Sequence, residues 1–127
     1  IIDGKDIHHL MTKQRPRRNP EDFFLFFNSG ELQAIRQGRW KLHFPHQYRS
    51  LKENPGRDGT PGVYVQKLIE TALFDLDSDI GEQHDISSDQ LNIVLRLKTL
   101  AQQARKNLGD RITQIKGLQV RPPGTLP

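Results

Sequence analysis

The short stretch from His43 to Arg49 holds the side chains in this sequence best suited to binding chemistry. His43, His46, Tyr48 and Arg49 stand within seven positions of one another. Histidine and arginine hydrogen-bond hydroxyl groups and anionic oxygens, and a tyrosine ring stacks on the face of a sugar. We therefore interpret these four residues as the rim of a carbohydrate site. The alternative is that they fix their own loop or contact a neighbouring domain.

Two other groups invite a metal-binding interpretation, and neither has the required spacing. His8 and His9 are adjacent, and adjacent side chains do not converge on one ion in a helix or a strand. Acidic residues with alternate spacing follow later: Asp75, Asp77, Asp79 and Glu82. They partly resemble a calcium loop, but the glycine and the distal glutamate of that pattern are misplaced. We interpret the acidic group as turn and helix-capping residues and predict no metal site.

Composition limits the chemistry further. The chain has no cysteine, which excludes a cysteine nucleophile, a thiolate zinc site and a disulfide framework within it. Its net charge of +4 favours an anionic partner, for which nucleic acid, a sulfated sugar and an acidic domain are all candidates.

Neither nucleic acid nor a membrane is an expected partner. A basic cluster lies near the start of the chain: Lys13, Arg15, Arg17 and Arg18. It lacks interleaved aromatic residues, and the aromatic run at residues 23–27 lacks the Lys, Arg and Gly spacing of an RNA-binding strand. No apolar run approaches the roughly 18 to 20 residues that span a bilayer.

The elements that position these residues are predicted from apolar patterning. With 127 residues the chain suits one domain, and its 34% of apolar residues predicts a thin core, with apolar surface kept for a partner domain. Residues 23–27 are expected to form a central strand covered on both faces. Residues 32–36 and 39–44 predict a hairpin that turns at Gln37 and Gly38.

A long loop is expected next, because residues 45–62 are rich in proline, glycine and charge. Residues 63–68 are expected to add a short edge element and residues 71–76 a fourth strand.

One long helix follows. Ser87 with Gln90 resembles a capping box, and Ile86 with Leu91 a hydrophobic staple. Seven apolar residues then fall on one arc at helical spacing: Ile93, Val94, Leu97, Leu100, Ala101, Ala104 and Leu108. Gly109 is expected to end the helix, and the polar chain from Asp110 is expected to be extended or mobile.

Four segments carry a resemblance to the formylglycine-dependent sulfatases of the arylsulfatase A type. Residues 32–43, LQAIRQGRWKLH, resemble a hairpin near the end of those enzymes, and residues 72–82, ALFDLDSDIGE, resemble their strand and turn. Residues 2–7 resemble the segment that enters their C-terminal subdomain. Residues 108–110 with residues 120–124 resemble their endings. One departure is Ile80, where the family usually has proline.

This resemblance implies an α+β fold, with a small four-stranded antiparallel sheet and one long C-terminal helix packed on one face. It divides the chain into a lead-in at residues 1–22, a sulfatase C-terminal subdomain at residues 23–109 and an extended tail at residues 110–127. The implied partner is a large N-terminal catalytic domain of the alkaline phosphatase type.

The resemblance also implies where catalysis resides. Sulfatases use calcium and a formylglycine made from a Cys or Ser in a C/S-x-P-x-R motif, and none of the five serines here lies in such a motif. We therefore expect no catalytic residue and no cofactor in this chain, and both in the parent protein. The absence of an initial Met suggests a fragment, and the family implies a periplasmic or secreted location.

The sequence is consistent with two functions. The chain is expected to complete a sulfatase that hydrolyses a sulfated carbohydrate or an aryl sulfate, with its histidine-rich loop on the pocket rim. The alternative is a free-standing basic module that binds sulfated polysaccharide.

Overall fold

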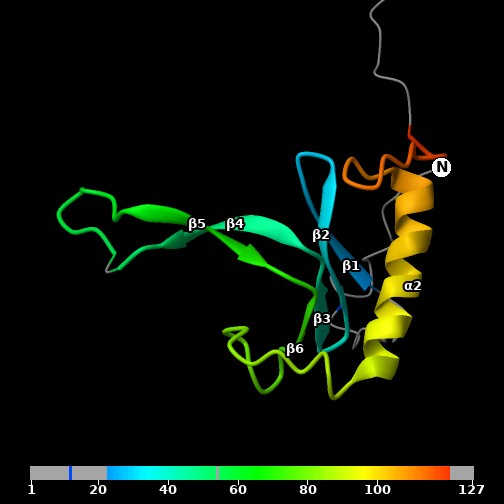
Figure 1. Ribbon diagram of the computed structural model, residues 1–127, viewed down its shortest axis with the longest axis horizontal. Coiled ribbons are helices and arrows are strands. Elements are labelled where there is room, and N and C mark those ends of the chain that lie inside the picture. Colours follow the sequence, from blue (N-terminus) through cyan, green and yellow to red (C-terminus); the bar gives the residue numbers. More distant parts are fainter. Residues whose placement is uncertain (1–11, 13–22, 54, 121–127) are drawn as a thin grey trace, which may run out of the picture.

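Six strands and one helix make up the part of the chain that the structure, a computed structural model, describes: residues 12, 23–53 and 55–120 (Figure 1). The elements are β1 (Phe23–Asn28), β2 (Glu31–Gln37), β3 (Trp40–His43), β4 (His46–Leu51), β5 (Tyr64–Ile69), β6 (Ala72–Asp75) and α2 (Leu91–Leu108). The predicted α+β fold is confirmed. The predicted lead-in, its basic cluster and the His8–His9 pair lie outside the described residues, except for Thr12.

Four of the strands form an antiparallel sheet in the order β1-β2-β3-β6. The predicted hairpin is β2–β3, but its turn is one residue later than expected. Gln37 pairs with Trp40, so Gly38 and Arg39 form the turn. Gly38 takes a φ of 60°, in the left-handed region that favours glycine.

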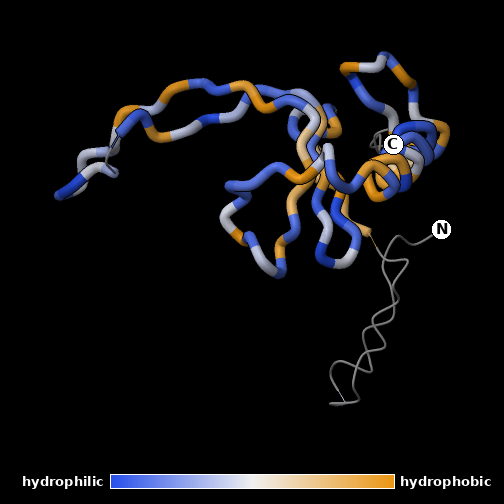
Figure 2. The backbone as a smooth tube through the Cα atoms, turned by 60° about the horizontal axis from the view of Figure 1, so that its bottom comes forward, coloured by the Kyte–Doolittle hydropathy of each residue, from blue (hydrophilic) through white to orange (hydrophobic). Residues whose placement is uncertain are grey.

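The core lies between this sheet and α2. The register aligns Leu25, Ile35, Leu42 and Leu73 in one row across the four strands, on the face that packs against Leu97. Figure 2 shows hydrophobic segments of the sheet and helix meeting at the centre of the molecule. The predicted helical arc is confirmed at its centre, where Val94, Leu97, Ala101 and Ala104 are buried. Leu108 at its end is 50% exposed.

The aromatic strand β1 does not occupy the centre of the sheet, so that prediction is wrong. It pairs with β2 on one side only and forms an edge. Its rings remain exposed, with Phe24 at 63%. A run with apolar residues on both faces needs a covering layer on each face, and within the described residues the helix supplies one layer only.

The long loop expected at residues 45–62 is a wrong prediction over residues 46–51. These residues pair with residues 64–69 to form the two-stranded hairpin β4–β5, which projects from the sheet as an arm (Figure 1). The expected edge element is strand β5 of this arm. Proline and glycine concentrate at the tip of the arm, where the loop remains. The strands on either side form by pairing with each other, and the amino-acid composition of the stretch does not reveal that pairing.

The helix begins later than its sequence signals predict. It starts at Leu91 without a side-chain cap, and Leu91 is 62% exposed, so the capping box and the staple are both wrong. Ser87 instead contacts Asp85, donating from its backbone N–H to Oδ1 at 2.9 Å and from its hydroxyl to Oδ2 at 3.0 Å. The predicted end is confirmed, because Gly109 has a φ of 84° and donates to the carbonyl of Arg105.

The segment after the helix turns back instead of extending away. Asp110 is only 3% exposed and bridges to Ile115. The N–H of Leu118 donates to the carbonyl of Lys106 at 3.0 Å, which fastens the segment to the last turn of α2. The expected extended path is therefore wrong over residues 110–118, and residues 121–127 lie outside the described part.

Candidate functional site

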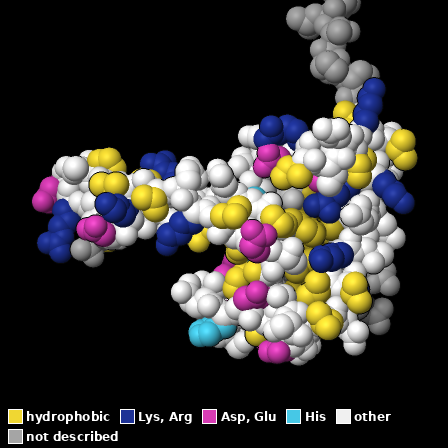
Figure 3. Space-filling model, viewed as in Figure 1, with side chains coloured by type: hydrophobic (Ala, Val, Ile, Leu, Met, Phe, Trp, Pro, Cys, Tyr) yellow, Lys and Arg dark blue, Asp and Glu magenta, His cyan; other side chains and the backbone are white. Residues whose placement is uncertain are grey.

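A hollow of about 480 Å³ lies at the base of the arm. One wall is the inner face of β4–β5, and the other is the loop that follows β6. The residues that line it include His43, His46, Tyr48, Lys67 and Glu82. In Figure 3 the arm stands out from the body of the molecule, with a notch between it and this loop.

Strand alternation decides which arm residues face the hollow. His46, Tyr48 and Ser50 share the inner face of β4, while the residues between them point outward. Arg49 is therefore on the outer face, where its guanidinium lies 3.6 Å from the centre of the Tyr64 ring. Of the four predicted rim residues, the structure brings His43, His46 and Tyr48 together at the hollow and places Arg49 away from it.

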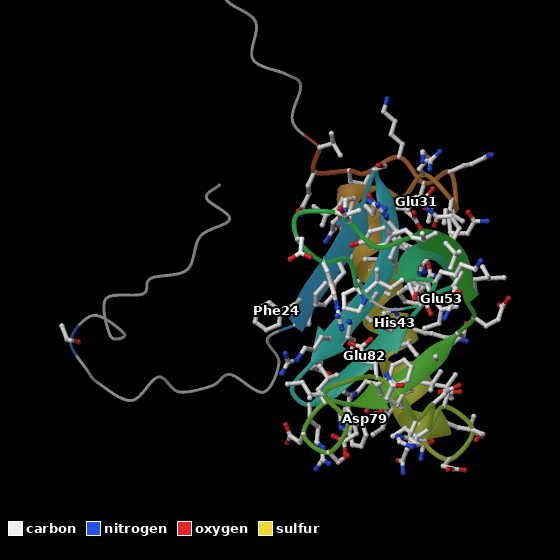
Figure 4. All side chains as sticks on the ribbon, turned by 90° about the vertical axis from the view of Figure 1, so that its left-hand side faces the viewer. Phe24, Glu31, His43, Glu53, Asp79 and Glu82 are labelled. Atoms are coloured by element: carbon white, nitrogen blue, oxygen red, sulfur yellow. The ribbon has the colours of Figure 1, made fainter. Side chains whose placement is uncertain are left out.

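Glu82 is the centre of a charged cluster on the open face of the sheet. Lys41 and His43 are two residues apart on β3, so both point away from α2. The Nζ of Lys41 lies 2.5 Å from Oε1 of Glu82, and Nε2 of His43 lies 2.8 Å from Oε2. Figure 4 shows the labelled Glu82 next to His43. Glu82 has a φ of 53°, a strained left-handed conformation that its two partners help to hold.

His43 is kept neutral by its surroundings. Burial lowers its pKa below the usual 6.5, and the nearby Lys41 charge acts in the same direction, while Glu82 opposes both. Because a carboxylate only accepts hydrogen bonds, Nε2 carries the proton and donates to Glu82. The buried Nδ1 has no partner among the described residues. His43 therefore acts as a fixed wall, with its ring stacked on His46 at a centroid distance of 5.4 Å.

His46 lines the hollow and has one ring nitrogen engaged by its own segment. Its Nδ1 lies 2.7 Å from the carbonyl oxygen of Phe44, and since a carbonyl only accepts, Nδ1 donates. In the neutral ring this leaves the lone pair on Nε2 free for a hydroxyl donor. The neighbouring Tyr48 ring is 41% exposed and meets His46 edge to face at 6.4 Å.

Sequence reasoning missed Lys67 and Glu82 as residues of the hollow. Lys67 stands directly opposite Tyr48 in the β4–β5 register. No sequence signal connects the two, because the link is made by pairing across the arm. Glu82 ends one of the motifs that carry the family resemblance, so that motif was the available signal.

Of the acidic residues predicted to serve turns and helix caps, Asp75 and Asp79 bind backbone N–H groups of the turn, and none caps α2. Asp75 pairs with Arg39, and this contact lowers the pKa of its carboxyl to about 2. Asp79 accepts the backbone N–H groups of Gln83 and His84, each at 2.8 Å, and these bonds lower the pKa of Asp79. Over residues 23–53 and 55–120, no three metal-binding side chains come together.

The hollow therefore combines a lysine, a carboxylate, an imidazole acceptor and an exposed phenol ring. Such a set suits the binding of a polar, hydroxyl-rich ligand.

Comparison with known protein families identifies the family of this chain. Residues 19–125 match the family described as the C-terminal region of aryl-sulfatase. Searches of curated proteins and of solved structures gave no match. Among the described residues, no helix is both long and apolar enough to cross a membrane.

Proposed function

This chain belongs to the family of the C-terminal region of aryl-sulfatases, and we propose that it completes the fold and the substrate rim of a sulfatase. The parent protein hydrolyses sulfate esters of a carbohydrate or an aryl alcohol. Its N-terminal catalytic domain carries out the reaction, and this region docks against that domain. A periplasmic or secreted location belongs to the same proposal.

The formylglycine and calcium of such an enzyme belong to the catalytic domain. The chain has no cysteine, and none of its serines lies in the required motif. The acidic residues that resemble a calcium loop are already engaged: Asp75 and Asp77 by Arg39, Asp79 by backbone amides and Glu82 by Lys41 and His43. These carboxylates do not fit a calcium site, so this region supports the reaction by positioning substrate.

The exposed surface supports docking of another domain. The edge strand β1 leaves its outer backbone groups unpaired within the described residues and exposes Phe24, Phe26 and Phe27 at 63%, 42% and 39%. An apolar edge of this kind favours pairing or aggregation unless it is covered. A catalytic domain packed on this side covers it.

The hollow at the base of the arm supports a role at the substrate rim, and this observation carries the proposal. His46 and Tyr48 meet there on strand β4, and the His43 ring stacks on His46. Arg49 stacks on Tyr64 on the outer face of the arm, so we assign it no part in the rim.

The test uses the full-length parent with two substrates, a sulfated sugar and a small aryl sulfate that does not reach the rim. His46→Ala is expected to raise KM for the sugar alone, lowering kcat/KM about two- to tenfold for one lost hydrogen bond between neutral groups. Arg49→Ala is the matched control from the outer face and is expected to leave both substrates unchanged.

Equal losses on both substrates for His46→Ala would point to a structural role, and no loss on either would overturn the rim assignment. The isolated chain is expected to show no turnover of either ester above a buffer control. A full-length protein that binds sulfated polysaccharide without hydrolysing any sulfate ester would replace the proposal with the free-standing binding module.

A further inference from the structure

Lys67 places a positive charge in the hollow that no described carboxylate neutralises. Its side chain is exposed at the wall of the hollow and forms no ion pair with any described residue. The nearby Lys41 differs, because Glu82 holds its ammonium group at 2.5 Å. A free ammonium group on a concave wall attracts an anionic group of a ligand.

The ring of Tyr48 lies beside Lys67 and offers a surface on which a sugar ring stacks. The two residues are direct partners in the antiparallel register, which places their side chains next to each other on the inner face of the arm. The phenol ring is 41% exposed. A sugar ring stacked on Tyr48 therefore brings a charged substituent within reach of Lys67.

The opposite wall provides hydrogen-bond acceptors. Lys41 and His43 hold the Glu82 carboxylate in place, at 2.5 and 2.8 Å. Carboxylate oxygens accept several hydrogen bonds, so Glu82 retains capacity for ligand hydroxyls. On the arm itself, Nε2 of the neutral His46 ring adds another acceptor.

From this arrangement we propose that the hollow is a subsite for an acidic sugar and that Lys67 is its specificity-determining contact. The anionic substituent binds Lys67, the ring stacks on Tyr48, and hydroxyl groups donate to Glu82 and His46. Among the described residues that line the hollow, Lys67 is a free cation facing a carboxylate, which suits a ligand with one charged group and many hydroxyls and disfavours a polyanion such as nucleic acid. The inference rests on the proposed function for the expectation that the charged group is a sulfate ester.

The subsite is tested by NMR titration of the 127-residue chain with glucose 6-sulfate and with glucose. The wild-type chain is expected to bind the sulfated sugar more tightly, with shifts at β4, β5 and Glu82. Lys67→Met is expected to weaken binding of glucose 6-sulfate about ten- to a hundredfold, which is the effect of losing one charge-assisted hydrogen bond. It is expected to leave glucose binding unchanged.

Two further variants separate charge recognition from structural damage. Lys67→Arg keeps the charge and is expected to restore most of the preference for the sulfated sugar. Lys98→Met removes an exposed lysine from α2, outside the hollow, and is expected to bind like the wild type. Thermal unfolding of all three variants checks that the fold is retained.

Equal affinity of the wild-type chain for both sugars, no binding of glucose 6-sulfate, or unchanged binding by Lys67→Met would each overturn the subsite. Those outcomes leave the proposed function intact if the full-length parent still hydrolyses sulfate esters. If the full-length parent hydrolyses no sulfate ester but the chain still binds glucose 6-sulfate more tightly than glucose, the proposed function is overturned and the subsite is retained.

Discussion

Arg105 and Asp110 form a buried ion pair at the end of α2, with Nε of the arginine 2.7 Å from Oδ2 of the aspartate. Their side chains are 9% and 0% exposed. Asp110 also accepts the backbone N–H of Leu32 at 3.3 Å and the hydroxyl of Thr113 at 3.1 Å. One carboxylate thus connects the helix, strand β2 and the segment that follows the helix.

Replacing Asp110 by alanine is expected to destabilise the chain by about 3 to 5 kcal/mol, because it leaves the Arg105 charge buried without a partner. Urea unfolding followed by circular dichroism measures this change. The control is Arg111→Ala, which breaks an exposed pair with Glu31 and is expected to cost less than about 1 kcal/mol. Similar losses for both variants would mean that the Asp110 pair is not sealed from water.

The core prediction concerns Leu97, whose side chain is fully buried between α2 and the sheet. Leu97→Ala is expected to lower the free energy of unfolding by about 2 to 5 kcal/mol, through lost burial and the cavity left behind. Leu95 on the same helix is 63% exposed, so Leu95→Ala is expected to change it by less than about 0.5 kcal/mol. A loss below that value at Leu97 would contradict the packing of the helix on the sheet.

Gly117 lies so close to the end of the helix that no side chain fits there. An added Cβ would stand 2.4 Å from the carbonyl carbon of Leu108 and 2.6 Å from the nitrogen of Gly109. Gly117→Ala is therefore expected to displace the segment and to lower the melting temperature by several degrees.

Gly38 is the matched control, since an added Cβ there meets nothing within 4 Å. Gly38→Ala is expected to cost only the roughly 1 to 2 kcal/mol of a left-handed backbone in a residue other than glycine. Differential scanning calorimetry compares the two variants, and a smaller effect at Gly117 than at Gly38 would contradict the close approach.

Stability is expected to fall in acid because the folded state lowers the pKa of Asp75 from 3.8 to about 2, chiefly through its hydrogen bond with Arg39. The unfolded state binds the proton first, so this contribution is complete above about pH 4 and is lost as the pH falls toward 2. The free energy of unfolding, measured by urea titration from pH 5 to 2, is expected to decrease across this window.

Asp75→Asn is expected to show a shallower decrease over the same pH range, because its side chain does not titrate. Leu95→Ala retains every carboxyl group and serves as the control, with the slope of the wild type expected. Identical slopes for the wild type and Asp75→Asn would show that the Arg39 contact does not persist in solution.

Local signals predicted a large part of the fold. The glycine at position 38, the apolar arc through Leu97 and the glycine at position 109 each act within a few residues, so the hairpin, the helical face and the helix end were visible in the sequence. The motifs at residues 32–43 and 72–82 likewise led to the sulfatase family, which the match to residues 19–125 confirms.

Competition between nearby groups accounts for some of the errors. Ser87 was predicted to cap the helix, but Asp85 engages it, and Asp85 is itself fixed by accepting the N–H of Leu73 at 2.9 Å. Asp110 was predicted to begin an extended tail because its neighbours are polar. Its burial depends on Arg105 and on the N–H of Leu32, which only the folded chain brings near.

The candidate site depended most on tertiary structure. His43, His46, Tyr48 and Arg49 lie within seven positions of the sequence. The sequence by itself therefore determined the region of the hollow. The alternation of β4 then turned Arg49 outward, and pairing with β5 brought Lys67 to Tyr48. Glu82 reached Lys41 and His43 only through the loop that follows β6. Pairings between residues distant in the chain decided which charges face the hollow. Strand register sets the direction of each side chain, and no local sequence pattern encodes that register.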